Sequence, residues 1–169
     1  DAPVATAGAT LAYTENAAPA AIDNTITVTD IDSTQLTSAT ITLSSGFTAG
    51  DVLGFTQQNN IVAQYNSSTG VLTLSGTDTL GNYQTALRSV SFSSTSDNPT
   101  ATGTSRTVSW IVNDGSSQFN LSSAVTSTIN IIPVNDPPTL STISSPQMFN
   151  EDGNTGVLSF TIGDADNTV

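Results

Sequence analysis

The fold is decided by one alternating stretch, Val108-Ser109-Trp110-Ile111-Val112. Successive side chains of a β-strand point to opposite faces, so Val108, Trp110 and Val112 share one face, which we expect to be the core. The same period of two recurs at 25–29, 40–43, 71–74 and 128–131. Thr and Val fit a pleated surface and lose rotamer freedom in a helix, so these stretches predict strands.

Turn-forming residues separate the alternating stretches. They include Ser45-Gly46, the run 66–70, Asp97-Asn98-Pro99 and Asp114-Gly115. Short strands with turn signals at this spacing predict an all-β fold, an antiparallel sandwich.

One segment breaks the strand pattern. Leu80, Tyr83 and Leu87 fall at helical spacing, which predicts one short helix near 80–88. Asp78 precedes them and is a candidate N-cap for this helix.

The composition is acidic but not charge-dense. The 169 residues carry 14 acids, two basic residues and no histidine, for a formal net charge of −12, and only 9% are charged. Nucleic-acid binding needs clustered cations, which Arg88 and Arg106 cannot supply. The absence of Cys and His excludes disulfides, zinc sites built on these residues, and Ser-His-Asp or Cys-His catalysis. No apolar run approaches the roughly 20 residues of a membrane-spanning helix.

An internal repeat divides the chain. Three landmarks recur: Asp1-Ala2-Pro3 as Asp136-Pro137-Pro138, Tyr13-Thr14-Glu15-Asn16 as Phe149-Asn150-Glu151-Asp152, and Asp30-Ile31-Asp32 as Asp164-Ala165-Asp166. Their offsets are 135, 136 and 134 residues. They predict a complete repeat over 1–135, followed over 136–169 by a proline-stiffened linker and the first strands of a second, incomplete repeat.

The spacing of the acids points to a hard cation. Asp30-x-Asp32 and Asp164-x-Asp166 each end an alternating strand, so the paired carboxylates converge where the strand stops. Carboxylates so close repel by about a few kcal/mol at an effective dielectric of about 20. Calcium relieves this repulsion with flexible oxygen coordination, whereas magnesium demands stricter octahedral geometry. Asp30 and Asp32 could instead be turn residues that bind their own backbone.

Several motifs also occur in a family-specific order. They are Thr29-Asp30-Ile31-Asp32-Ser33, Thr69-Gly70-Val71 with Asp78 after it, Asn113-Asp114-Gly115, and Val134-Asn135-Asp136-Pro137-Pro138. In this order the chain resembles the cadherin-like tandem repeats of giant bacterial (RTX-type) surface adhesins. The Arg and Glu that usually accompany the acidic motif near Asp78 are missing.

This resemblance implies a Greek-key β-sandwich of about seven strands, cadherin- or immunoglobulin-like, with a calcium cluster at each repeat junction. For the junction inside the chain it implies as ligands Glu15, Asn135, Asp136, Asp164 and Asp166, with Asp78 as an addition. For the N-terminal junction it implies half a cluster, from Asp1, Asp30, Asp32 and Asp114. The Asp114-Gly115 pair could alternatively form a plain hairpin turn.

The leading hypothesis is a calcium-rigidified structural repeat of an extracellular adhesin or fibre, not an enzyme. Such a module would be secreted or held on the bacterial cell surface, extend the protein outward, and serve cell adhesion or filament assembly. Its partners would be neighbouring repeats of the same protein.

The incomplete repeat raises a further question of partners. A couple of strands cannot bury a core alone, so we expect other copies to cover Val157, Leu158, Phe160 and Ile162 by strand addition into a filament. Packing of these residues onto the first repeat is the alternative.

A carbohydrate- or ice-binding module is the alternative function. The chain holds 29 Thr and 23 Ser, which can present rows of hydroxyls on β-faces. Two segments, Asn66-Ser67-Ser68 and Asn120-Leu121-Ser122, match the N-glycosylation acceptor pattern, which a chain so rich in these residues also produces by chance.

Overall fold

The structure is a computed structural model that describes residues 1–141 and 160–166. The chain divides into two compact units, Asp1–Val134 and Asn135–Val169. The expectations for Val157 and Leu158 lie outside the described residues. Among the residues described, no helix is long and apolar enough to cross a membrane.

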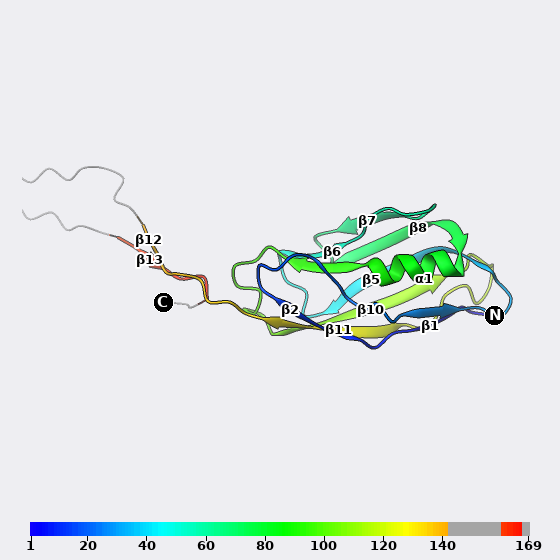
Figure 1. Cartoon of the computed structure of the whole chain (residues 1–169), viewed down its shortest axis with the longest axis horizontal. Helices are drawn as coiled ribbons and strands as arrows, with labels where there is room; N and C mark the ends of the chain where they lie inside the picture. Colours follow the sequence, from blue (N-terminus) through cyan, green and yellow to red (C-terminus); the bar gives the residue numbers. More distant parts are fainter. Residues whose placement is uncertain (142–159, 167–169) are drawn as a thin grey trace, which may run out of the picture. The chain divides into compact units, whose positions relative to one another are not determined.

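A six-stranded sheet forms one layer of the first unit, in the order β2-β11-β10-β5-β8-β7 (Figure 1). Its strands are β2 (Thr10–Thr14), β5 (Gln35–Ser45), β7 (Val62–Asn66), β8 (Val71–Thr79), β10 (Ser105–Asn113) and β11 (Val125–Ile132). Neighbours pair antiparallel except β2 and β11, which are parallel. The first strand of this sheet in chain order, β2, thereby lies beside the last, β11.

The remaining elements of the first unit are short. They are the pair β1 (Val4–Thr6) and β4 (Thr27–Thr29), the sheet of β3 (Ala20–Ala21), β9 (Ser91–Ser94) and β6 (Asp51–Gly54), and helix α1 (Leu80–Ser89). Helix α1 packs against β4, β5 and β8, and Figure 1 shows it lying lengthwise over the sheet. The predicted all-β sandwich with one short helix is confirmed. Within Asp1–Val134, all of which is described, it has eleven strands rather than about seven, because five of them span only two to four residues.

The cap of helix α1 differs from the prediction. The hydroxyl of Thr79 accepts a hydrogen bond from Asn82 N at 3.2 Å, which makes Thr79 the N-cap, and the assignment of Asp78 to that role is wrong. The Asp78 carboxylate instead accepts from Asn82 Nδ2 at 2.6 Å, from Thr79 N at 2.8 Å and from Asn60 N at 3.1 Å. These bonds, that from Asn82 first, lower the pKa of Asp78.

The aromatic side chains belong to the core. Trp110, Tyr83 and Phe92 are fully buried, as the alternation around Trp110 predicts. The indole N–H of Trp110 donates to Ser127 Oγ at 3.0 Å, so its one polar atom is satisfied inside. None of these three rings can therefore form an exposed platform for stacking a sugar.

The second unit repeats the opening pairing of the first. Its strands β12 (Thr139–Leu140) and β13 (Ile162–Gly163) pair antiparallel, with Thr139 opposite Gly163. In the first unit, Val4 lies opposite Thr29. Thr139 follows Val4 by 135 positions and Gly163 follows Thr29 by 134, which are two of the offsets found in the sequence.

Candidate metal centre

Three carboxylates gather at one end of the first unit. Asp30 follows β4, Asp32 lies two residues on, and Asp114 follows β10. Each offers a carboxylate oxygen, and these oxygens all lie within 4.8 Å of one another. The sequence predicted all three as ligands, and the fold brings them together from positions 84 residues apart. The group could hold a metal ion, and we call it the acidic cluster.

Asp30 divides its two oxygens between two tasks. Its Oδ1 accepts hydrogen bonds from Asp32 N at 3.1 Å and Ser33 N at 3.2 Å, which fixes the turn after β4. Its Oδ2 is buried and has no hydrogen-bond partner. The two alternatives from the sequence, turn residue and cation ligand, are therefore compatible, because each uses a different oxygen.

Asp114 is held by the loop that it opens. Its Oδ1 accepts from Ser116 N at 2.9 Å and from Ser116 Oγ at 2.8 Å, and Gly115 adopts a φ of 83°. The next strand, β11, begins only at Val125. Asn113 pairs antiparallel with Leu121, so Asp114-Gly115 opens a hairpin loop over 114–120 and not a two-residue turn.

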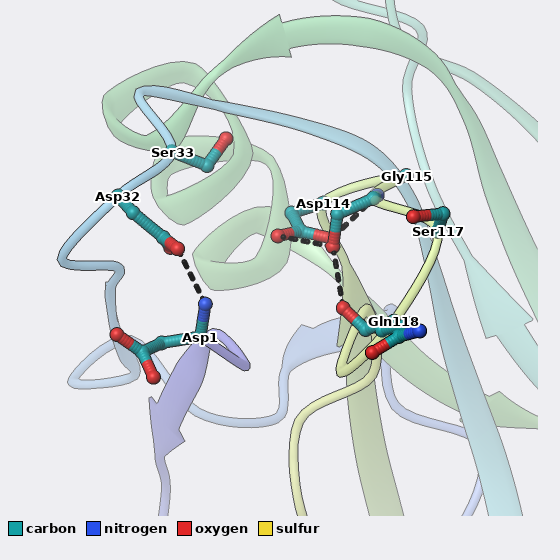
Figure 2. A pocket seen from close by; sticks show the side chains of 8 residues that line it. Asp1, Asp32, Ser33, Asp114, Gly115, Ser117 and Gln118 are labelled. Atoms are coloured by element: carbon teal, nitrogen blue, oxygen red, sulfur yellow. Dashed lines mark hydrogen bonds and ion pairs between the residues drawn. The ribbon is translucent and has the colours of Figure 1, made fainter.

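Two residues of the acidic cluster, Asp32 and Asp114, line an open pocket (Figure 2). Asp32 faces the amino group of Asp1 on one side, and Asp114 lies opposite with Gln118 on its loop. The Asp1 ammonium forms an ion pair with Asp32. Its pKa is raised, first by the hydrogen bond to Asp32 and then by the charges of Asp32, Asp30 and Asp114, while the ammonium lowers the pKa of Asp32. All three acids thus raise the pKa of the Asp1 ammonium, as expected where negative charges are concentrated.

Glu15 lies where β2 and β11 end, and the chain leaves the first unit there (Figure 1). Its backbone N–H donates to Ile132 O at 2.9 Å, and its Oε2 accepts from Val134 N at 2.9 Å. The side chain is buried, yet Oε1 has no hydrogen-bond partner. Glu15 thus keeps one free oxygen, as Asp30 does.

The second unit repeats the turn of the first. Asp166 N donates to Asp164 Oδ1 at 3.1 Å, which matches the bond from Asp32 N to Asp30 Oδ1. Asp166 Oδ2 in turn accepts from Asp136 N at 2.6 Å, and Asp136 Oδ2 is buried without a hydrogen-bond partner. The amide of Asn135 donates to the Asp136 carbonyl oxygen at 2.8 Å. That these residues join Glu15 around one ion stays a prediction.

Two other predicted ligands have different surroundings. Both oxygens of Asp78 already accept hydrogen bonds, and Asp78 is not one of the three acids of the cluster. Asp1 contacts the acidic cluster through its ammonium, which forms the ion pair with Asp32. The predictions missed Ser116, whose contacts fix Asp114, because a loop serine two residues after an Asp-Gly pair carries no distinctive signal.

Comparison with known proteins shows a similarity to part of a much longer protein. No protein family profile matches the chain. Over 91 residues, half of this chain, it is 40% identical to Halomucin of Haloquadratum walsbyi (strain DSM 16790 / HBSQ001). The chain spans about 1% of the length of that protein.

Proposed function

We propose that the chain is a calcium-rigidified structural repeat of an extracellular surface protein, extending the protein outward and serving adhesion. The similarity to Halomucin suggests a surface-protein repeat and supports the extracellular part of the proposal. The recurrence of the β1 and β4 pairing in β12 and β13 supports the tandem arrangement. Neighbouring repeats of the same protein are the proposed partners.

One observation carries the calcium assignment: a buried, unpartnered Asp30 Oδ2 beside two further carboxylates. A buried carboxylate oxygen without a partner is costly, and like charges at this distance add repulsion. The donors are all oxygen, from half-buried and exposed acids in loops, which suits calcium better than magnesium or zinc. Bound calcium would supply a positive partner to Asp30 Oδ2, which the Asp1 ammonium, paired with Asp32, does not provide.

The proposed mechanism is electrostatic. Without calcium, the carboxylates at the end of a repeat repel and the loops after β4 and β10 separate. With calcium, Asp30, Asp32 and Asp114 are drawn together. We propose the same for Asp164 and Asp166 with Asp136, Asn135 and Glu15 at the junction, so that successive repeats become one rigid rod.

Calcium is expected to stabilise the chain. At 100 times the dissociation constant, one site that binds only the folded state adds about 2.7 kcal/mol to the free energy of unfolding. Melting temperature and calorimetric heat, followed during a calcium titration, measure this gain. Asp30→Asn with Asp114→Asn should remove the response of the acidic cluster, and Asp164→Ala with Asp166→Ala that of the junction.

Asp97→Asn is the matched control, because Asp97 is an exposed acid outside both groups. It should leave the calcium response unchanged. If the unaltered chain shows neither binding heat nor a higher melting temperature in millimolar calcium, the proposal is wrong. X-ray scattering gives a second readout, because rigid repeats should lengthen the particle in calcium.

A carbohydrate- or ice-binding face is the second candidate. The register places Thr42, Ser109 and Thr126 on neighbouring strands of the six-stranded sheet. These three side chains are half-buried or exposed and carry no charge. A glycan array and an ice-recrystallisation assay test this face, and inactivity in both removes the candidate.

The exposed apolar residues of the second unit carry the proposal of filament assembly. Phe160 is 60% exposed and Ile162 52% exposed. We propose that strands of another copy cover them. A strictly monomeric particle by light scattering, at all concentrations tested, contradicts this assembly.

A further inference from the structure

Two segments match the pattern Asn-x-Ser/Thr, and the fold presents them differently. Asn66-Ser67-Ser68 lies in the connection between β7 and β8, and Asn120-Leu121-Ser122 lies in the connection between β10 and β11. We propose that Asn66 is an N-glycosylation acceptor in the folded protein and that the fold closes Asn120 to the same reaction. An acceptor site must present the asparagine amide and the hydroxyl two residues later together, so both can be compared directly.

The Asn66 segment is open at both required positions. Asn66, Ser67 and Ser68 are all exposed at the tip of a β-hairpin. Asn66 Oδ1 accepts from Ser68 N at 3.0 Å, and Asn66 O accepts from Gly70 N at 2.9 Å. These hydrogen bonds hold the turn and use only the two oxygens of Asn66. The reactive Asn66 Nδ2 and the Ser68 hydroxyl remain available at the surface.

The Asn120 segment is closed at both positions. Asn120 is half-buried, and its Nδ2 donates to Asn113 Oδ1 at 3.3 Å. Ser122 is only 6% exposed, and its hydroxyl oxygen accepts from Val112 N at 3.0 Å. The backbone N–H of Ser122 also donates to Val112 O at 2.9 Å. An enzyme could reach this serine only after the segment left β10.

The reaction is a group transfer from a polyprenyl-diphosphate-linked oligosaccharide. Asn66 Nδ2 attacks the anomeric carbon of the first sugar, and a carbon–nitrogen bond forms. The bond from that carbon to the diphosphate oxygen breaks, the diphosphate leaves with the electron pair, and a proton from Nδ2 passes to the solvent. Gln64, two residues before Asn66, is uncharged, so the matching enzyme is one that requires no acid at that position.

The surface location of Asn66 in the cell rests on the proposed extracellular function, because such transferases act outside the cytoplasm. The acceptor chemistry does not involve the acidic cluster. Asp30→Ala with Asp114→Ala should therefore abolish calcium binding there and leave glycan transfer to Asn66 unchanged. The two proposals can fail separately.

The test uses the purified, folded chain with a single-subunit oligosaccharyltransferase and a polyprenyl-diphosphate-linked oligosaccharide. Intact mass and peptide mapping are expected to show one glycan per chain, on Asn66. Asn66→Gln and Ser68→Ala should each abolish the transfer, while the matched variants Asn120→Gln and Ser122→Ala leave it unchanged. Melting temperatures show whether each variant is folded.

Synthetic peptides spanning 62–72 and 116–126 separate the effect of the fold from that of the local sequence. Both peptides are expected to accept the glycan. No transfer to the folded chain, when the 62–72 peptide is modified, overturns the proposal. Equal transfer to Asn66 and Asn120 in the folded chain, or a 116–126 peptide that stays unmodified, overturns the claim that the fold selects between them.

Discussion

Replacing Arg106 with methionine is expected to lower the free energy of unfolding by about 3–5 kcal/mol, the usual cost of removing one partner of a buried ion pair. Arg106 Nε donates to Asp51 Oδ2 at 2.7 Å, and both side chains are fully buried. Without the guanidinium, Asp51 keeps a buried charge whose Oδ2 still accepts a hydrogen bond from Thr48 N at 3.0 Å. Asp51 Oδ1 already has no hydrogen-bond partner.

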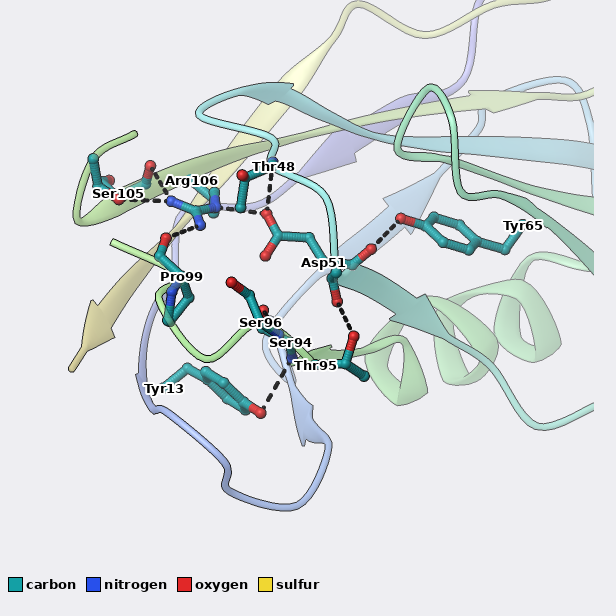
Figure 3. A network of polar contacts seen from close by, with 12 residues as sticks. Tyr13, Thr48, Asp51, Tyr65, Ser94, Thr95, Ser96, Pro99, Ser105 and Arg106 are labelled. Atoms are coloured by element: carbon teal, nitrogen blue, oxygen red, sulfur yellow. Dashed lines mark hydrogen bonds and ion pairs between the residues drawn. The ribbon is translucent and has the colours of Figure 1, made fainter. Parts of the chain in front are cut away.

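The same guanidinium also fixes a loop (Figure 3). One terminal nitrogen of Arg106 donates to Gly103 O at 2.8 Å and the other to Pro99 O at 2.6 Å. Methionine would fill part of the volume but would leave the buried Pro99 carbonyl unpaired, at about 1–3 kcal/mol, whereas water could reach the carbonyl of the exposed Gly103. The loop before β10 should then lose protection in hydrogen exchange.

Arg88→Met is the matched control, since Arg88 is the chain's other basic residue. It is half-buried and its Nε bonds a single carbonyl, Ile26 O, at 2.8 Å. Urea unfolding should show a much smaller loss for it, about 1 kcal/mol. Adding Asp51→Leu to Arg106→Met should restore part of the stability, because the unpaired charge is then gone. Equal losses for both single variants, or no recovery in the double variant, contradict this account of the pair.

The core strand around Trp110 could be predicted from the sequence, but the partner of Arg106 could not. Period-two alternation around Trp110 predicted the core strand, because side-chain direction in a strand depends only on position. The same alternation places Arg106 in phase with Val108 and Trp110, which signals a buried arginine, but it cannot name the partner. Asp51 lies 55 positions away on another sheet, and that pairing depends on how the layers pack.

The candidate metal centre was predictable for a different reason. Asp30 and Asp32 stood out because their spacing recurs one repeat later, whereas Asp114 was assigned only through the family resemblance of its Asn113-Asp114-Gly115 motif. Which oxygen of Asp30 caps the turn and which stays free depends on backbone angles that spacing does not encode. Asp23 had no signal, although it is nearly fully buried, because its partners come from segments over 100 residues apart.

Replacing Asp23 with asparagine is expected to cost about 3–5 kcal/mol at neutral pH. Asp23 Oδ2 accepts from Gly8 N and Ala9 N, both at 3.0 Å, and from Ser127 Oγ at 2.8 Å. Its Oδ1 accepts from Thr25 N at 2.9 Å and Thr25 Oγ1 at 2.7 Å. An asparagine has only one side-chain oxygen, so its NH₂ group must face donors on one side. Hydrogen bonds to a charged acceptor contribute about 1.5–3 kcal/mol each.

The loss should depend on pH with a definite sign. Burial raises the pKa of Asp23, but the hydrogen bonds from Gly8, Thr25, Ala9 and Ser127 outweigh burial and hold the pKa well below its ordinary value. An unfolded aspartate titrates near about 3.9, so the stabilisation is fully present above that pH and is lost as the pH falls toward the lower pKa of the folded state. The unaltered chain should therefore lose stability faster than Asp23→Asn between about pH 4 and pH 2.

Urea unfolding at pH 7, 4 and 3 measures the difference between the two proteins, with the exposed Asp97→Asn as the matched control. The difference should be largest at pH 7 and should shrink at pH 3, while the control stays close to the unaltered chain throughout. A difference that is constant over this range would mean that Asp23 acts through packing alone.

The structural consequence of losing the Asp23 carboxylate is local, because Asp23 binds the backbone at Gly8 and Ala9, where the chain passes from β1 to β2. Weakening these hydrogen bonds should loosen the pairing of β2 with β11. It should therefore also loosen the backbone at the end of β2, which positions Glu15.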